Sequence, residues 1–411
     1  MNKDILKQLS KRRSFSLQAD GESMLPLLHP MDLVNYQKIS FSKIKTNDLI
    51  LIFKKNIAFT HRVIYKAKKY LVTKGDNNLE SDGKIYLRNI VGKVTSVKRK
   101  NKIIDPEMIY LIQSSLYFKE IIKIVNAFNR EKIDYVFLKG LPVHLYYEKT
   151  HPRRIYQDAD IMIRRPDFEK IQRVMFKFGY KLADSSLSSF QKKLQDKTSE
   201  ISFYKLINGF PVVFDIHQEA IFLMNQLGSL EALYLQKYID QITDKFFREK
   251  IKVTLNGSSF FLLSPVNSII FLAFHLFRHN FIGPYRFELL NKVIRKSHFR
   301  SALIDMLNKY RLNNFILPVF YLLNKYYKTH YNAVFLKKIK KYENINIFDD
   351  QDRLSMGINR FFVLFSLSPQ PFYKKILIFT YPKVINAVVF SISQKFNNLL
   401  KNVFSSPTLN L

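Results

Sequence analysis

The sequence predicts a multidomain α+β protein, in which a small, mostly β domain precedes a mixed α/β domain that continues into a helical carboxyl-terminal region. Three observations predict this class. The chain has 411 residues, 47% of them hydrophobic, which suffices for at least two cores because single domains usually close at about 100 to 200 residues. Short β-type runs bounded by Gly, Asn, Asp or Ser fill residues 14–98. Beyond them, helical spacing alternates with strand-like runs.

The composition limits the sites and partners that the chain can have. There is no cysteine, so neither disulfides nor a thiolate zinc site can form, and any metal must bind carboxylates or imidazoles. The 66 Lys and Arg residues against 33 Asp and Glu residues give a formal net charge of +33, which attracts nucleotides, nucleic acid or an anionic membrane. Most of the surplus is lysine spread along the chain, without the signature of a dedicated nucleic-acid module. We therefore expect solvated surface lysines and no specific nucleic-acid partner.

These patterns divide the chain into five segments. The sequence predicts a basic tail, a β domain, a catalytic α/β domain, a helical region of that domain, and a linker followed by apolar and basic helices, over residues 1–13, 14–100, 101–225, 226–342 and 343–411.

Neither end of the chain has the pattern of a membrane span. The basic amino terminus lacks an apolar stretch long enough for a signal peptide or a spanning helix, so export is not expected. Residues 376–392 are strongly apolar, but Pro382 and Lys383 interrupt them and lysines flank them. That pattern fits a buried helix, with a peripheral amphipathic anchor as the alternative. We expect a cytoplasmic protein whose only membrane contact would be peripheral.

The catalytic segment alternates helices and strands. Pro106 stands near the start of a long helix with apolar residues at spacings of three and four. After it we expect a strand, a helix, an acidic strand, a helix and a strand ending in acid, in the order DYVFLKG, LPVHLYYEK, QDADIMI, PDFEKIQRVMFKFG and FPVVFDIHQ. Such alternation is typical of a sheet covered by helices.

Ser23 and His61 are the first candidate site. A serine hydroxyl is a weak nucleophile near neutral pH unless a base accepts its proton, and histidine suits this role because its ordinary pKa is about 6.5. A carboxylate would then hold the imidazole in the required tautomer, and Asp76 and Asp82 are both available. On spacing alone, a structural turn at Ser23 remains an alternative.

Four segments taken in order, GESMLP, TNDLILIF, THRVI and TKGDNNLESD, resemble type I signal peptidases of the branch that uses histidine as the base. The resemblance covers residues 14 to about 96. It implies Ser23 as the nucleophile, His61 as the general base and Asp82 as its supporting acid, with Asp76 shaping a loop. It also implies a mostly β fold that cleaves peptides after small side chains, with the substrate bound as an added strand.

The chain departs from that family in three ways. HPMD stands where the family has a glycine before Asp32, TND replaces the usual Gly-Asp before LILIF, and the expected membrane anchor ahead of Ser23 is absent. Together these departures favour a peptidase acting on a leader peptide or on the chain itself over ordinary secretory processing. An inert β module that binds peptides is the alternative.

Asp158, Asp160 and Asp215 are the second candidate site. Asp158 and Asp160 alternate on a predicted strand, so their carboxylates point to the same face. Asp215 ends another β-type run. Carboxylates so close together repel one another, and the ionised cluster is stable chiefly when a divalent cation is bound. The three aspartates can therefore hold Mg²⁺ and position a nucleoside triphosphate.

The surrounding residues resemble a family of nucleotidyltransferases with a Leu-Lys-Gly turn, an arginine before Asp-x-Asp and a later Asp-x-His strand. Here these are Leu138-Lys139-Gly140, Arg154, Asp158-Ala159-Asp160 and Asp215-Ile216-His217. The resemblance, over about residues 110 to 300, implies a polymerase-β-like mixed sheet that uses Mg²⁺ and a nucleoside triphosphate. It implies that Lys139, Gly140 and Arg154 bind the nucleotide, while His275 and His279 are read as structural. The Gly-Ser turn of better-known members is absent, because Leu141 follows Gly140.

The combined reading is a bifunctional protein for peptide maturation. One half would cleave a peptide or protein and the other would transfer a nucleotidyl group. The alternative is that one half alone is active and the other binds peptide or nucleotide.

Overall fold

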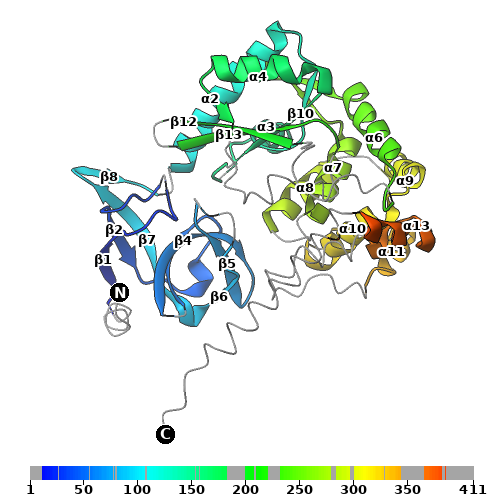
Figure 1. Cartoon of the computed structure of the whole chain (residues 1–411). Coiled ribbons are helices and arrows are strands. Elements are labelled where there is room, and N and C mark those ends of the chain that lie inside the picture. Colours follow the sequence, from blue (N-terminus) through cyan, green and yellow to red (C-terminus); the bar gives the residue numbers. More distant parts are fainter. Residues whose placement is uncertain are drawn as a thin grey trace.

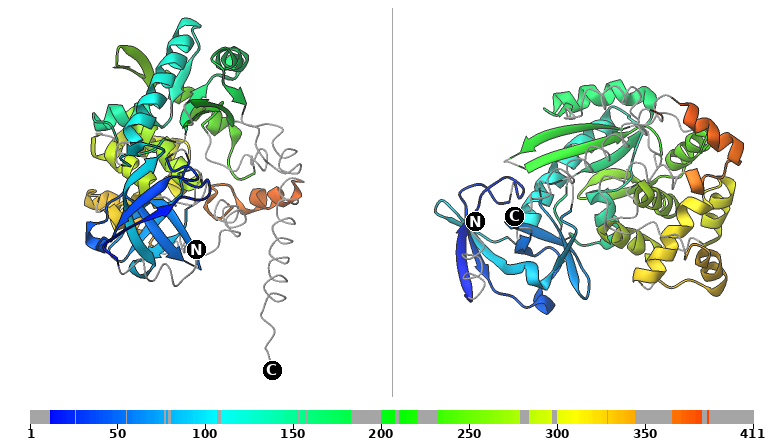
Figure 2. Two further views of the ribbon diagram at one scale, coloured as in Figure 1. Left: turned by 90° about the vertical axis from the view of Figure 1, so that its left-hand side faces the viewer. Right: turned by 60° about the horizontal axis from the view of Figure 1, so that its bottom comes forward.

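The structure is a computed structural model of the whole chain. It describes residues 12–182, 200–220, 232–278, 284–296, 300–343, 365–381 and 385, apart from positions 26, 55, 77, 79, 80, 107, 108, 153, 157, 208, 209 and 328. Figure 1 shows two lobes, a β lobe in blue tones and a larger lobe that combines a second sheet with most of the helices. The two views of Figure 2 show the same division.

The β domain is one antiparallel sheet. Its described strands follow the spatial order β1-β2-β7-β3-β4-β5-β6, with β8 paired to β7. Its elements are β1 (Ser14–Gln18), β2 (Leu33–Gln37), η1 (Phe41–Lys43), β3 (Leu49–Lys54), β4 (Ile57–Lys66), β5 (Tyr70–Lys74), β6 (Lys84–Tyr86), η2 (Leu87–Asn89), β7 (Ile90–Arg99) and β8 (Lys102–Ile104).

Strand β3 explains how this small domain builds its core. Its sequence LILIF is apolar at consecutive positions, and both faces of the strand are buried between β7 and β4. Because successive strand residues point to opposite faces, Leu49 and Leu51 join one apolar cluster while Ile50 and Ile52 join another. The sheet therefore separates two cores, and each face of β4 and β5 meets a different environment.

The second lobe contains a mixed sheet in the order β11-β12-β13-β10-β9-β15-β14. The pairs β10 with β13 and β9 with β15 are parallel, and the other described pairs are antiparallel. The strands are β9 (Tyr135–Phe137), β10 (Ala159–Ile163), β11 (Lys181–Leu182), β12 (Glu200–Ile207), β13 (Phe210–His217), β14 (Ile251–Leu255) and β15 (Ser258–Leu262).

Helices bury this sheet with their apolar faces. On α6, for example, Ile239, Ile242 and Phe246 are buried at helical spacing. The buried apolar residues of sheet and helices form one continuous cluster that reaches Ile378. The helical elements are α2 (Ile109–Arg130), α3 (Leu141–Glu148), η3 (Arg165–Asp167), α4 (Phe168–Lys177), α6 (Gln236–Arg248), α7 (Pro265–Arg278), α8 (Pro284–Lys296), α9 (Arg300–Lys309), α10 (Asn313–Tyr327), α11 (Ala333–Lys340), α13 (Phe372–Ile376) and η5 (Leu377–Thr380).

The structure corrects two predicted segments. The region 226–342 is not purely helical, because β14 and β15 form a hairpin that joins the sheet beside β9. Its turn is Asn256-Gly257, both at positive φ, and Asn-Gly is a strong hairpin signal. In addition, β8 pairs with β7, so the β sheet extends past the predicted boundary at residue 100.

The apolar stretch expected as a buried helix is only partly buried where the structure describes it. In α13 and η5, Ile378 is buried, while Ile376, Leu377 and Phe379 are exposed. Of the rest of the stretch, Tyr381 and Ile385 alone are described. Among the described residues, no helix combines the length and apolar character that a membrane crossing requires.

The two lobes touch through apolar and polar surfaces. Phe210, from the start of β13, is buried within a core cluster of the β domain, and Leu116 and Ile155 pack against that cluster. Helix α8 contacts β4. One face of the β4–β5 pair therefore lies toward the second lobe.

Candidate functional site

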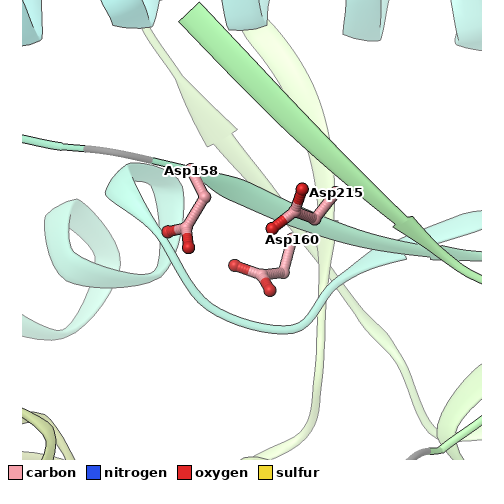
Figure 3. A group of neighbouring side chains, drawn as sticks. All are labelled: Asp158, Asp160 and Asp215. Atoms are coloured by element: carbon pink, nitrogen blue, oxygen red, sulfur yellow. The ribbon is translucent and has the colours of Figure 1, made fainter. Parts of the chain in front are cut away.

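Three carboxylates meet at the strands β10 and β13. Asp158 precedes β10, Asp160 lies on it, and Asp215 is the direct neighbour of Asp160 on the parallel strand β13. One oxygen from each carboxylate lies within 4.8 Å of the others. Figure 3 shows the three side chains turned toward a common space. Parallel pairing thus brings together acids that are more than fifty positions apart in the sequence.

Neighbouring side chains fix the orientation of these carboxylates. The imidazole Nε2 of His217 lies 3.1 Å from Asp160 Oδ1, and the Ser202 hydroxyl donates to Asp215 Oδ1 at 2.6 Å. The Lys139 ammonium lies 3.2 Å from oxygens of both Asp158 and Asp160. Hydrogen bonds and ion pairs of this kind commonly orient carboxylate ligands around metal ions.

The pKa values of the aspartates show that accumulating negative charge in this cluster is unfavourable. Burial, followed by the charges of Asp160 and Asp158, raises the pKa of Asp215 from an ordinary 3.8 to about 7. Burial also acts to raise the pKa of Asp158, but Lys139, Arg154 and Arg286 outweigh it and hold that pKa below its ordinary value. Asp158 is therefore easily ionised, while Asp215 resists ionisation until more positive charge arrives.

The cluster fits a divalent cation. Asp160 Oδ2 is buried and makes no hydrogen bond of regular geometry, although it lies 3.2 Å from the Lys139 ammonium. A carboxylate oxygen with two lone pairs can therefore still accept a further cation or donor here. Lys139 offsets one negative charge. Burial acts to lower the pKa of His217, but the hydrogen bond to Asp160 and the charge of Glu200 outweigh it and hold that pKa above its ordinary value. Full ionisation of Asp215 leaves the cluster negative. Carboxylate oxygens are the ligands that Mg²⁺ takes in proteins.

Gly140 begins helix α3 at a φ of 94°, a conformation that disfavours any side chain. A Cβ here would lie 3.4 Å from the Ala159 Cα and 3.5 Å from the Asp158 carbonyl oxygen. These are ordinary van der Waals distances, so the positive φ, and not a lack of space, is what favours glycine at this position. The turn places the neighbouring Lys139 beside the carboxylates.

Arg154 is held in place by residues that the sequence did not single out. Its guanidinium lies 4.9 Å from the centre of the Tyr156 ring, and its Nη1 lies 3.3 Å from His144 Nε2. Because arginine only donates, His144 Nε2 accepts, which leaves the proton on Nδ1 for the Tyr156 hydroxyl 3.2 Å away. Burial, together with the charge of Arg154, lowers the pKa of His144 well below its ordinary value, so this arrangement persists at neutral pH.

The β domain brings Ser23, His61 and Asp82 into one hydrogen-bonded chain. His61 Nε2 lies 2.9 Å from Ser23 Oγ, and His61 Nδ1 lies 2.8 Å from Asp82 Oδ2. Thr73, unnoticed in the sequence, donates to the same Asp82 oxygen at 2.7 Å. With Asp82 as the acceptor, His61 carries its proton on Nδ1, and Nε2 is then able to accept the proton of the Ser23 hydroxyl.

Asp76 lies outside this chain. It forms a bidentate ion pair with Arg62, at 2.8 and 2.7 Å, in which both side chains are buried. The pair braces the loop after β5, in keeping with the loop-shaping role that the peptidase resemblance implies. Elsewhere, His275 is buried on α7 beside the ring of Phe271, whereas His279 lies outside the described residues.

The comparisons with known proteins bear on the second lobe. A family model described as an uncharacterised nucleotidyltransferase matches residues 110–328. The matched range contains Lys139, Arg154 and the three clustered aspartates, and it does not include the β domain. The search of curated proteins found no match.

Replacing Asp215 with asparagine is expected to stabilise the protein at neutral pH when no divalent cation is present. The pKa of Asp215 is higher in the folded chain than in the unfolded chain, so stability falls as the pH rises from about 4 to about 7. Asparagine carries no charge, and its oxygen still accepts from Ser202. Urea unfolding with EDTA at about pH 7.5 should show a gain of at least about 1 kcal/mol that disappears near pH 4. A loss of stability at pH 7.5 would contradict this electrostatic description.

Proposed function

Because the chain belongs to the family of uncharacterised nucleotidyltransferases, matched over residues 110–328, we propose that it transfers a nucleotidyl group from a nucleoside triphosphate with the aid of Mg²⁺. The observation that carries this proposal is the carboxylate cluster of Asp158, Asp160 and Asp215. When bound there, Mg²⁺ would neutralise the phosphate charge that grows during transfer. The cluster lies within the matched range, and Lys139 is in contact with it.

The residues of the site would have different roles in such a transfer. A bond forms between the acceptor and the α-phosphorus, and the bond to the leaving pyrophosphate breaks. Asp158, Asp160 and Asp215 would hold the metal ion together, since their oxygens lie within reach of one another. Lys139 and Arg154 supply positive charge beside Asp158 and would bind and orient the phosphates.

Substitution of Asp158 or Asp160 by asparagine should abolish transfer of label from α-³²P nucleoside triphosphates. Each substitution removes a charge that binds the metal, and we expect at least about a 100-fold loss of rate. The assay offers all four ribonucleotides with Mg²⁺, the purified protein and a cell extract as acceptor, and EDTA should abolish the signal.

The matched control is Asp240→Asn, because Asp240 is exposed on α6, where it accepts a surface hydrogen bond from Gln236. It should transfer label like the wild type. Label transfer by Asp158→Asn at the wild-type rate would contradict the role of the cluster.

The hydrogen-bonded chain of Ser23, His61 and Asp82 supports a second candidate function, that of a serine peptidase. In this reaction Ser23 Oγ bonds to the carbonyl carbon of a peptide and its proton passes to His61 Nε2. His61 then donates that proton to the leaving amine, and water hydrolyses the ester that remains. Backbone N–H groups near Ser23 would stabilise the oxyanion. The substrate would be a leader-like peptide or protein segment, as the sequence resemblance implies.

A fluorescent fluorophosphonate should label Ser23 in the wild-type protein. Ser23→Ala should abolish labelling, and His61→Ala should slow it at least about 100-fold, because the hydroxyl loses its base. Ser16→Ala is the control, since Ser16 is an exposed β1 residue that bonds only to Asn35. Equal labelling of wild type and Ser23→Ala, or no labelling of folded wild type, would refute the peptidase proposal.

A further inference from the structure

Helix α2 packs on the sheet of the second lobe, and two of its buried polar residues contact the backbone beside the carboxylate cluster. These residues, Gln113 and Tyr117, are four positions apart, so they project from the same face of the helix. Neither carries a charge, and neither belongs to the motifs that contain the aspartates. Each is hydrogen-bonded to a different one of the two segments that carry Asp158 and Asp215.

Tyr117 bonds to both backbone polar groups of Val213 on β13. Its hydroxyl donates to the Val213 carbonyl oxygen and accepts from the Val213 N–H at 3.2 Å. A tyrosine hydroxyl can do both, because it has one donor hydrogen and also accepts. Val213 stands two positions before Asp215, so the two side chains point to the same face of the strand. One hydroxyl thus fixes the backbone of β13 just before its aspartate.

This contact lies where the parallel pairing of β10 and β13 begins. The first Cα pair is Ala159 with Phe214, and Asp158 and Val213 are the residues immediately before them. In the register of the described strands, Val213 therefore has no partner on β10, and its N–H and carbonyl groups meet the tyrosine hydroxyl. Tyr117 takes the place of a neighbouring strand at the edge of the cluster.

Gln113 holds the other segment through two hydrogen bonds to one residue. Its Nε2 donates to the Tyr156 carbonyl oxygen at 2.6 Å, and its Oε1 accepts from the Tyr156 N–H at 3.1 Å. These groups are buried, where an unpaired backbone group is unfavourable. Tyr156 stands two positions before Asp158, and its ring lies 6.2 Å from that of Tyr117. The two contacts are therefore adjacent, and together they span both segments that carry the aspartates.

The Tyr117 hydroxyl also lies within the electrostatic field of the cluster. Burial, and then the charge of Asp158, raise the pKa of Tyr117 well above its ordinary value, against the opposing effect of the hydrogen bond to Val213. Asp215 and Asp160 add to the increase. The hydroxyl therefore keeps its proton at neutral pH and remains a donor to β13.

We propose that Gln113 and Tyr117 are positioning residues of the metal site, and that they hold Asp158 and Asp215 at the separation that a divalent cation requires. This inference rests on the proposed Mg²⁺-dependent transfer. Mg²⁺ requires near-ideal octahedral geometry, so a small displacement of one ligand weakens its binding. The ionised carboxylates repel one another, and a backbone fixed on both segments resists the displacement that this repulsion favours.

The test measures binding of Mn²⁺, in place of Mg²⁺, to the full-length protein by electron paramagnetic resonance. Tyr117→Phe removes the hydroxyl and keeps the ring, and its Kd for Mn²⁺ should rise at least about tenfold, as is usual when a group that orients metal ligands is lost. Gln113→Met keeps the length of the side chain and removes both amide groups. It should weaken Mn²⁺ binding in the same way, and it tests the inference independently of the first variant.

The matched control is Tyr135→Phe, which also removes a buried tyrosine hydroxyl bonded to a backbone oxygen, that of Ser259. Tyr135 pairs with Ile163, three positions beyond Asp160 on β10. Urea unfolding should show that this variant loses stability, as Tyr117→Phe does, whereas its Kd for Mn²⁺ should equal that of the wild type. A purely structural role of Tyr117 would instead give the two variants the same metal affinity.

Hydrogen exchange of the wild-type protein needs no variant and decides the matter if neither variant folds. Because metal binding and the positioning contacts would stabilise one another, Mg²⁺ should slow exchange in the peptides that contain Tyr156 and Val213 more than in the peptide that contains Val253 of β14. Equal effects on all three peptides would contradict the inference.

The outcomes separate this inference from the proposed function. If the wild type binds Mn²⁺ and loses it in Asp158→Asn, while Tyr117→Phe and Gln113→Met bind with unchanged Kd, the inference falls and the proposed function stands. If the wild type binds no Mn²⁺ at all, both fall.

Discussion

Like charges repel most strongly where water is scarce, and the mixed sheet holds three carboxylates at neighbouring positions despite this repulsion. The parallel pairing of β10 and β13 sets Asp160 beside Asp215, and burial excludes the water that would screen their charges. Lys139, His217 and Ser202 keep the oxygens in place. The repulsion among the three carboxylates explains the turn at Gly140, the position of Lys139 and the raised pKa of Asp215.

The sheet of the β domain contributes residues to a different site on each of its two faces. On β4, His61 turns to Ser23 and Asp82, while the next residue, Arg62, turns to a cavity beside the second lobe. On β5, Thr73 and Lys74 divide in the same way. A shift of either strand by one residue would exchange the two faces and disrupt both sites. The candidate peptidase site and the lining of the cavity beside the second lobe are therefore linked through the register of a single hairpin.

Much of this arrangement follows from local sequence patterns. Alternation on a strand predicted that Asp158 and Asp160 face the same way, and the short β-type runs of residues 14–98 predicted a β domain. Other features depend on contacts between distant segments. Ser202 and Asp215 meet only because β12 pairs with β13, and Tyr117 reaches Val213 only because α2 packs on the sheet. The β14–β15 hairpin, in contrast, carried a local signal at Asn256-Gly257 that the expectation of a helical region overlooked.

The most direct test of a metal-dependent nucleotide site is a crystal structure of the protein with Mn²⁺ and a nucleoside triphosphate analogue that resists cleavage between the α- and β-phosphates. Anomalous scattering locates Mn²⁺ without reference to any assumed role for the aspartates. We expect an anomalous peak among Asp158, Asp160 and Asp215, with the triphosphate extending toward Lys139 and Arg154. An analogue bound elsewhere, with no anomalous peak at the three carboxylates, would contradict the site described for this chain.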